Sequence, residues 1–96
     1  MNRAQALNLL HEHLAEITAF GVKSLAIFGS VARDEARPDS DVDILVEFSH
    51  PVGLFQFIGL KQYLETLLDC QVDLGTSRSL KQHLQQEVLE SAVYVT

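Results

Sequence analysis

Hydrophobic side chains recur at helical spacing in three parts of the chain. In residues 3–20 they lie three or four positions apart and share one face of a helix, which Gly21 would end. A second stripe predicts a helix over residues 53–69, and a third predicts a last helix. The stripes consist of Leu7, Leu10, Leu14 and Ile17; of Leu54, Phe57, Leu60, Leu64, Leu67 and Leu68; and of Leu80, Leu84 and Val88.

Three shorter segments have the patterns of β-strands. Residues 24–28 are short and mainly apolar, which is typical of a buried central strand. Residues 41–48 alternate, and His50-Pro51 ends that strand. One of its faces carries Val42, Ile44, Val46 and Phe48, and the other carries Asp41, Asp43, Leu45 and Glu47. Residues 71–74 form a third strand closed by Gly75, and residues 92–95 form an apolar tail that either closes the core or contacts a partner.

The order of these elements is helix, strand, strand, helix, strand, helix, with no linker or repeat between them. This order predicts a single domain over residues 1–96, in which helices cover a small sheet, an α/β or α+β fold. The longest apolar runs are only a few residues, and no apolar targeting segment follows the N-terminus. We therefore expect a cytoplasmic protein that does not enter a membrane.

Charge and cysteine content narrow the function classes. The 13 acidic residues outnumber the 7 basic ones, and a net charge of -6 disfavours a general electrostatic grip on nucleic acid. The single cysteine, Cys70, excludes an internal disulfide and a cysteine-based zinc site. We interpret Cys70 as a small hydrophobic residue, the four histidines as non-ligands, Glu47 as a surface or pairing residue, and the two tyrosines as packing residues.

Three aspartates carry the candidate chemistry. Asp41 and Asp43 are two positions apart on one strand, so their side chains leave the same face about 7 Å apart. Asp73 lies on another strand, where the same alternation applies. Converging carboxylates repel one another unless a cation joins them, and Mg²⁺ prefers carboxylate and phosphate oxygens. Two such ions about 4 Å apart can hold both the attacking and the leaving oxygen of a phosphoryl transfer.

A calcium loop is the main alternative for the same segment. Residues 39–43 alternate acidic residues as the start of an EF-hand loop does. The sixth position would then be Ile44 where the loop needs glycine, and the twelfth would be His50 where it needs glutamate, so this alternative is excluded.

A candidate phosphate-binding segment precedes the aspartates. The strand over residues 24–28 ends in Gly29-Ser30, where glycine lets a phosphate approach the backbone and the serine hydroxyl can donate to it. If Ser30 caps a short helix, the amide groups of that helix would also face the anion. Arg33 is placed to reach the same phosphate or to pair with an aspartate. No P-loop motif is present.

The combination of Gly29-Ser30, ten further residues, Asp41-Val42-Asp43 and the later Asp73 resembles the signature of the polymerase-β-like nucleotidyltransferase superfamily. Residues 28–33 are similar to its minimal nucleotidyltransferase (MNT) branch, and the resemblance covers essentially the whole chain. It implies a small mixed sheet of three or four strands with flanking helices.

The resemblance also implies an activity. Members transfer a nucleoside monophosphate from ATP or another nucleoside triphosphate to an acceptor hydroxyl, with two Mg²⁺ ions. Carried over to this chain, Gly29, Ser30 and Arg33 would hold the triphosphate, and Asp41, Asp43 and Asp73 would bind metal. Asp73 would also act as general base.

The partner is a further expectation from the resemblance. Small MNT proteins often act as antitoxins paired with a HEPN-domain ribonuclease toxin, and some add AMP to a tyrosine of that toxin. One alternative is a binding module that neutralises its partner by contact alone. Another is a transferase for a small molecule such as an aminoglycoside, for which 96 residues leave no acceptor-binding domain unless a homodimer supplies one. The sequence does not specify the nucleotide or the acceptor.

Overall fold

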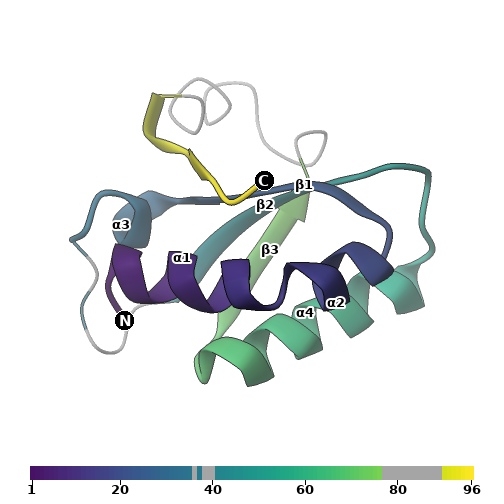
Figure 1. Ribbon diagram of the computed structural model, residues 1–96, viewed down its shortest axis with the longest axis horizontal. Coiled ribbons are helices and arrows are strands. Elements are labelled where there is room, and N and C mark those ends of the chain that lie inside the picture. Colours follow the sequence, from purple (N-terminus) through teal and green to yellow (C-terminus); the bar gives the residue numbers. More distant parts are fainter. Residues whose placement is uncertain (36, 38–40, 77–89) are drawn as a thin grey trace.

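Four strands form one mixed sheet in the order β3-β2-β1-β4 (Figure 1). The computed structural model describes residues 1–35, 37, 41–76 and 90–96. The strands are β1 (Val22–Phe28), β2 (Val42–Phe48), β3 (Val72–Thr76) and β4 (Val93–Tyr94). β1 pairs antiparallel with β2 and with β4, whereas β2 pairs parallel with β3. This topology confirms the small mixed sheet with flanking helices.

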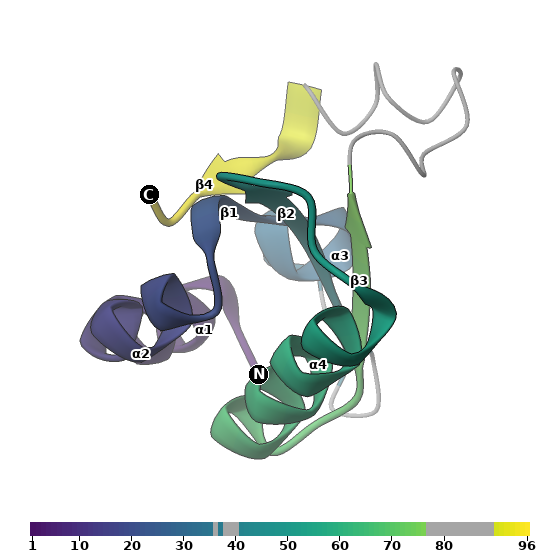
Figure 2. The same ribbon diagram turned by 90° about the vertical axis from the view of Figure 1, so that its right-hand side faces the viewer.

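Among the described residues, three helices cover one face of the sheet (Figures 1 and 2). They are α1 (Arg3–Glu12), α2 (Leu14–Ala19) and α4 (Leu54–Leu68), while α3 (Gly29–Ala32) is a single turn after β1. Apolar side chains of the sheet and of these helices form one core, in which Leu10, Ile17, Ile44, Leu60 and Leu64 are completely buried. Burying such side chains supplies most of the favourable free energy of folding.

The prediction of one helix over residues 3–20 is wrong at His13. Its backbone has φ -116° and ψ 21°, outside the helical range, and its N–H donates to Leu10 O at 3.3 Å. The Nδ1 atom of His13 lies 3.0 Å from Leu9 O, so the side chain is hydrogen-bonded to the last turn of α1. The apolar stripe continues across this break, because Leu10 before it and Ile17 after it are both buried. The stripe therefore could not reveal the break.

The strand β2 follows the predicted alternation. Val42, Ile44 and Val46 are buried, and the acidic positions between and beside them are not. In α4 the stripe is correct at Leu60, whereas Leu54, the first residue of the helix, is 70% exposed. Leu54 lies where the helix begins and is exposed, so its predicted place in the core is wrong.

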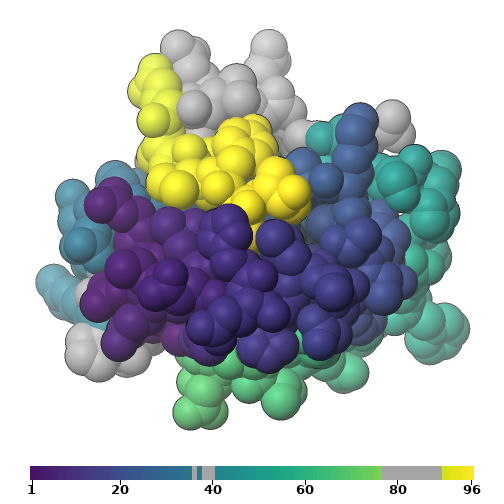
Figure 3. Space-filling model, viewed as in Figure 1, coloured from purple at the N-terminus to yellow at the C-terminus, as the bar shows by residue number. Residues whose placement is uncertain are grey.

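The C-terminal part of the sheet differs from the prediction in one respect. Gly75 does not close the third strand but continues it, paired with Leu45 of β2. The apolar tail is β4, and its following residue Val95 is buried with an exposed fraction of 5%, so the tail closes the core. Figure 3 shows the last residues, in yellow, lying beside the N-terminal helices. The predicted helix containing Leu80, Leu84 and Val88 lies outside the described residues.

In the part of the chain that the structure describes, no helix has the length and apolar character needed to cross a membrane.

Candidate functional site

Residues that the sequence marks as candidates lie beside one another at one end of the sheet. In the strand register, Asp43 is opposite Phe28 of β1 on one side and opposite Asp73 of β3 on the other. Gly29 and Ser30 follow Phe28 directly, and adjacent strands lie about 4.8 Å apart. The register therefore brings the glycine-serine pair and two of the three aspartates into one row.

The core determines which way these aspartates face. Val42 and Ile44, on either side of Asp43, are buried against the helices, so Asp43 leaves the opposite face of the sheet. Val72 and Leu74 are likewise buried, and Asp73 between them is exposed. This is the shared face that the sequence predicts. Asp41 comes directly before β2 and is also exposed.

Gly29 makes the closest approach to an aspartate in this row. Its φ of +69° lies in the left-handed region, which glycine adopts without the steric penalty of a side chain. A Cβ atom built on Gly29 would overlap the Asp43 Oδ2 atom and lie 3.1 Å from Asp43 Cγ. The backbone of this turn therefore packs directly on the Asp43 carboxyl group, and only glycine fits both requirements.

The turn α3 carries Ser30 but is not capped by it. The residue before the helix is Phe28, Ser30 is the second residue of the turn, and no side-chain capping bond is present. The conditional prediction that Ser30 caps a short helix is therefore wrong. Ser30 is half-buried, and its carbonyl accepts a hydrogen bond from the Glu35 N–H at 2.8 Å, which fixes its backbone from the far side of the turn.

Arg33 follows this turn and is paired with a neighbour. Its Nε atom lies 3.3 Å from Glu35 Oε2, and both side chains are well exposed. The positive charge of Arg33 still acts on the site, because it lowers the pKa of Asp43. Arg33 therefore lies within electrostatic range of Asp43, and its hydrogen-bonding partner is Glu35.

The electrostatics of the row centre on Asp43. Burial is the largest cause that raises the pKa of Asp43, and the negative charges of Asp73 and Asp41 raise it further, against the opposing effect of Arg33. Asp41 and Asp73 therefore both lie within electrostatic range of Asp43. Their negative charges make the Asp43 carboxyl group harder to ionise, and a bound cation would reverse this effect.

The donor set fits a divalent cation that arrives with a substrate. Within the described ranges, no three histidine, cysteine, aspartate or glutamate side chains form a group that could hold a metal ion, so Asp41, Asp43 and Asp73 do not make up such a group by themselves. Mg²⁺ does not need such a cage, because it is usually held by one or two carboxylates together with substrate phosphates and water. Asp41 and Asp43, two residues apart on one face, match this mode of binding.

Other polar residues have the ordinary contacts that the sequence predicts. Glu47 lies 3.7 Å from the Lys23 ammonium group and accepts a hydrogen bond from Ser24 Oγ at 3.3 Å. Cys70 is half-buried, and burial raises the pKa of its thiol. Neither residue belongs to the row of aspartates.

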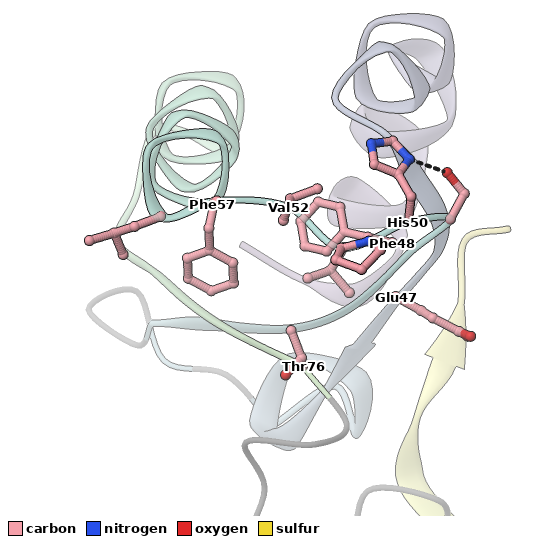
Figure 4. Close-up of a pocket in the computed structure, with 11 residues that line it drawn as sticks. Glu47, Phe48, His50, Val52, Phe57 and Thr76 are labelled. Carbon is pink, nitrogen blue, oxygen red and sulfur yellow. Dashed lines mark hydrogen bonds between the residues drawn. The ribbon is translucent and has the colours of Figure 1, made fainter.

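A cavity of about 660 Å³ lies at the other end of β2 (Figure 4). Its lining includes Phe48, His50, Val52 and Phe57, and Thr76 at the end of β3. No aspartate of the row lines it, because β2 runs from Asp43 at one end of the sheet to Phe48 at the other. No sequence pattern indicates this cavity, since its residues come from segments that meet only in the folded chain.

The chain matches known proteins over nearly its whole length. Residues 9–95 match the model of the nucleotidyltransferase domain family. The protein adenylyltransferase MntA of Thermococcus cleftensis is 46% identical over 89 residues, which is 92% of this chain and 90% of that protein.

Two solved structures show the same relationship at the level of the fold. One, assigned as a minimal nucleotidyltransferase, has a TM-score of 0.82 at 38% identity and covers 97% of this chain and 95% of that one. The other is a crystal structure of a toxin-antitoxin with AMP-PNP; its TM-score is 0.70 at 25% identity, over 100% of this chain and 73% of that one.

Proposed function

Because this chain belongs to the nucleotidyltransferase domain family, we propose that it transfers AMP from ATP to a hydroxyl group of a partner protein. The name of the Thermococcus relative, a protein adenylyltransferase, supports a protein as the acceptor. The observation that carries the proposal is the row of Asp73, Asp43 and Gly29, in which a glycine turn packs directly on a carboxylate that is flanked by another carboxylate.

Each residue of the row has a role in this reaction. Gly29 and Ser30 bind the triphosphate through the backbone and the hydroxyl group, and Arg33 adds a positive charge beside them. Asp41 and Asp43 would hold Mg²⁺ together with the substrate phosphates, and Asp73 would contribute as a further ligand once the cation and the phosphates are bound. Two bound Mg²⁺ ions would supply positive charge to the phosphate oxygens and to the leaving group.

The acceptor hydroxyl attacks the α-phosphorus of ATP. The new bond joins the acceptor oxygen to this phosphorus, the bond to the β-phosphate bridging oxygen breaks, and pyrophosphate leaves. Asp73 takes the proton of the acceptor hydroxyl, for which its exposed position on β3 gives access from solvent and from a docked protein.

We further propose that the acceptor is a tyrosine of a HEPN-type ribonuclease toxin, so that the chain acts as its antitoxin. The sequence resemblance to MNT domains supports this partner, and so does the structural similarity to a toxin-antitoxin crystallised with AMP-PNP.

The test is transfer of label from ATP to the partner toxin in the presence of Mg²⁺. Label on the α-phosphate should become attached to the toxin and label on the γ-phosphate should not, which distinguishes AMP transfer from phosphorylation. Asp43→Asn should abolish transfer, whereas Glu47→Gln, on the same strand and face but paired with Lys23, should not. Replacing the modified tyrosine by phenylalanine should remove the label.

Two results would change the proposal. If Asp43→Asn leaves label transfer unchanged, the site assignment is wrong. If no label is transferred and the same variant still neutralises the toxin fully, the chain is an antitoxin that acts by contact alone.

A further inference from the structure

The turn that carries Gly29 and Ser30 ends in a hydrogen-bond pattern that usually requires glycine. The Asp34 N–H donates to Val31 O at 3.0 Å, and the Glu35 N–H donates to Ser30 O at 2.8 Å. These two bonds define the Schellman motif, whose central residue is left-handed and most often glycine. Here that residue is Asp34, with a φ of 60°. An aspartate accepts some conformational penalty at this position and brings a carboxylate that glycine lacks.

The first residue of α1 binds this carboxylate. Asp34 Oδ1 accepts a hydrogen bond from the Arg3 N–H at 3.2 Å, and Arg3 Nη1 donates to Ala32 O at 3.2 Å. The Arg3 amide is one of the free donors at the start of a helix, and the Ala32 carbonyl is one of the free acceptors at the end of another. Both contacts therefore satisfy groups that would otherwise depend on water, and they join two elements about 30 residues apart in the chain.

The turn α3 depends on such support. It has only four residues, far fewer than a helix needs to be stable by itself. Val31 and Ala32 are buried in the core, so they keep the turn attached to the sheet, but they do not fix the half-buried Ser30. The contacts of Arg3 and Asp34 hold the segment that follows the buried Ala32, and the Glu35 N–H in that segment donates to Ser30 O.

We propose that Asp34 and Arg3 are positioning residues, which hold Gly29 and Ser30 in the orientation that binds the triphosphate. This inference rests on the proposed function, because it assigns to the Gly29–Ala32 turn the role of binding ATP. Neither residue contacts the three aspartates in the structure; both act through the backbone of α3.

The variants at Asp34 separate its two properties. Asp34→Gly keeps the left-handed backbone and removes the bond to Arg3, whereas Asp34→Asn keeps an acceptor oxygen and tolerates the same backbone. Arg3→Ala removes the bond to Ala32, and Lys23→Ala removes a similarly exposed cation that is paired with Glu47 instead.

The measurement is the dissociation constant of AMP-PNP with Mg²⁺, by titration calorimetry on the whole chain. Asp34→Gly and Arg3→Ala should each weaken binding about three- to tenfold, the value of one lost hydrogen bond. Asp34→Asn and Lys23→Ala should bind as the wild type does. Thermal unfolding of Asp34→Gly should occur at a temperature no lower than that of the wild type, since glycine relieves the left-handed backbone. In transfer assays the KM for ATP should rise with little change in kcat.

Three outcomes would overturn the inference. Asp34→Gly could bind AMP-PNP as tightly as the wild type, which would show that the contact does not position the turn. Asp34→Asn could bind as weakly as Asp34→Gly, which would show that the acceptor oxygen is not the cause. If the wild type itself binds no AMP-PNP, the proposed function is wrong and this inference falls with it.

Discussion

Replacing Gly29 with alanine tests the geometry of the site with a single methyl group. The first cost is backbone strain, because φ is +69° and an L-residue in the left-handed region loses about 1–2 kcal/mol. The second is the overlap of the new Cβ with the Asp43 carboxyl group, whose Cγ would be 3.1 Å away. If Asp43 leaves its rotamer to make room, this costs about 0.5–1.5 kcal/mol more. We expect Gly29→Ala to lower the free energy of unfolding by about 2–3 kcal/mol in total.

Urea unfolding, followed by circular dichroism, measures both parts separately. In an Asp43→Ala background the Oδ2 and Cγ atoms are absent, so that Gly29→Ala should cost about 1 kcal/mol less than in the wild type. Gly59→Ala is the matched control: its Cβ would lie 3.7 Å from the Phe20 Cε1 atom, an ordinary contact within a helix. That change should raise the free energy of unfolding by about 0.5–1 kcal/mol.

The same substitution should lower the rate of AMP transfer strongly. A carboxylate moved by about 1 Å from its working position can reduce the rate about 100-fold, and Asp43 must move to accept the methyl group. Two results would contradict this expectation: a Gly29→Ala variant as stable as the wild type, or a loss of stability that is equal with and without the Asp43 carboxyl group. Either result would mean that the glycine does not pack on this side chain.

Three further predictions concern charge, the end of α4, and packing. The pKa of Asp43 is raised in the folded chain, so the folded state favours the protonated carboxyl group. The stabilisation that protonated Asp43 gives to the folded state is complete below about pH 3.8, and it is lost as the pH rises through the raised pKa. Asp43→Asn should therefore remove this pH dependence in urea titrations without metal, and Mg²⁺ should raise the melting temperature of the wild type more than that of the variant. Asp69 ends α4 with a φ of 54°, so Asp69→Gly should raise the free energy of unfolding by about 0.5–1 kcal/mol in chemical denaturation, and a decrease would contradict this. Leu60→Ala should lower it by about 2–5 kcal/mol, whereas Phe55→Ala, at a side chain that is 92% exposed, should change it by less than about 0.5 kcal/mol.

Much of the fold could be predicted because the core imposes a simple period on the sequence. The alternation of Val42, Ile44 and Val46 with acidic residues is sufficient to identify both a strand and its polar face, and the structure keeps both. The same reasoning placed Asp73 opposite the core. The alternation predicts the direction of these side chains because only one face of each strand packs against the core.

The predictions that are wrong concern positions where a contact between particular residues determines the structure. The helix breaks at His13 because of backbone and side-chain bonds to the preceding turn, which leave the apolar stripe unchanged. Gly75 continues β3 because Leu45 pairs with it across the sheet, and a sequence pattern does not show a strand's partner. The sequence also does not indicate the role of Asp34 in holding the turn, because an aspartate at the end of a short turn is most often a solvated residue.

The register between β2 and β3 decides whether the site exists, and the aspartates themselves oppose it. A shift by two residues would keep the same face but would place Asp73 beside Asp41 or Leu45 instead of Asp43. Repulsion between Asp43 and Asp73 favours the shift that places Asp73 beside the uncharged Leu45.

Contacts at the start of β3 hold the register against this repulsion. The Val42 N–H donates to Gln71 O at 3.0 Å, and the Val72 N–H donates to Glu65 Oε2 of α4 at 3.2 Å. The buried pairs Val42 with Val72 and Ile44 with Leu74 exclude any shift by one residue, because that would expose them. The apolar face and one glutamate of α4 therefore hold Asp43 beside Asp73, although the charge of Asp73 raises the pKa of Asp43. A divalent cation bound at the proposed site would relieve this repulsion.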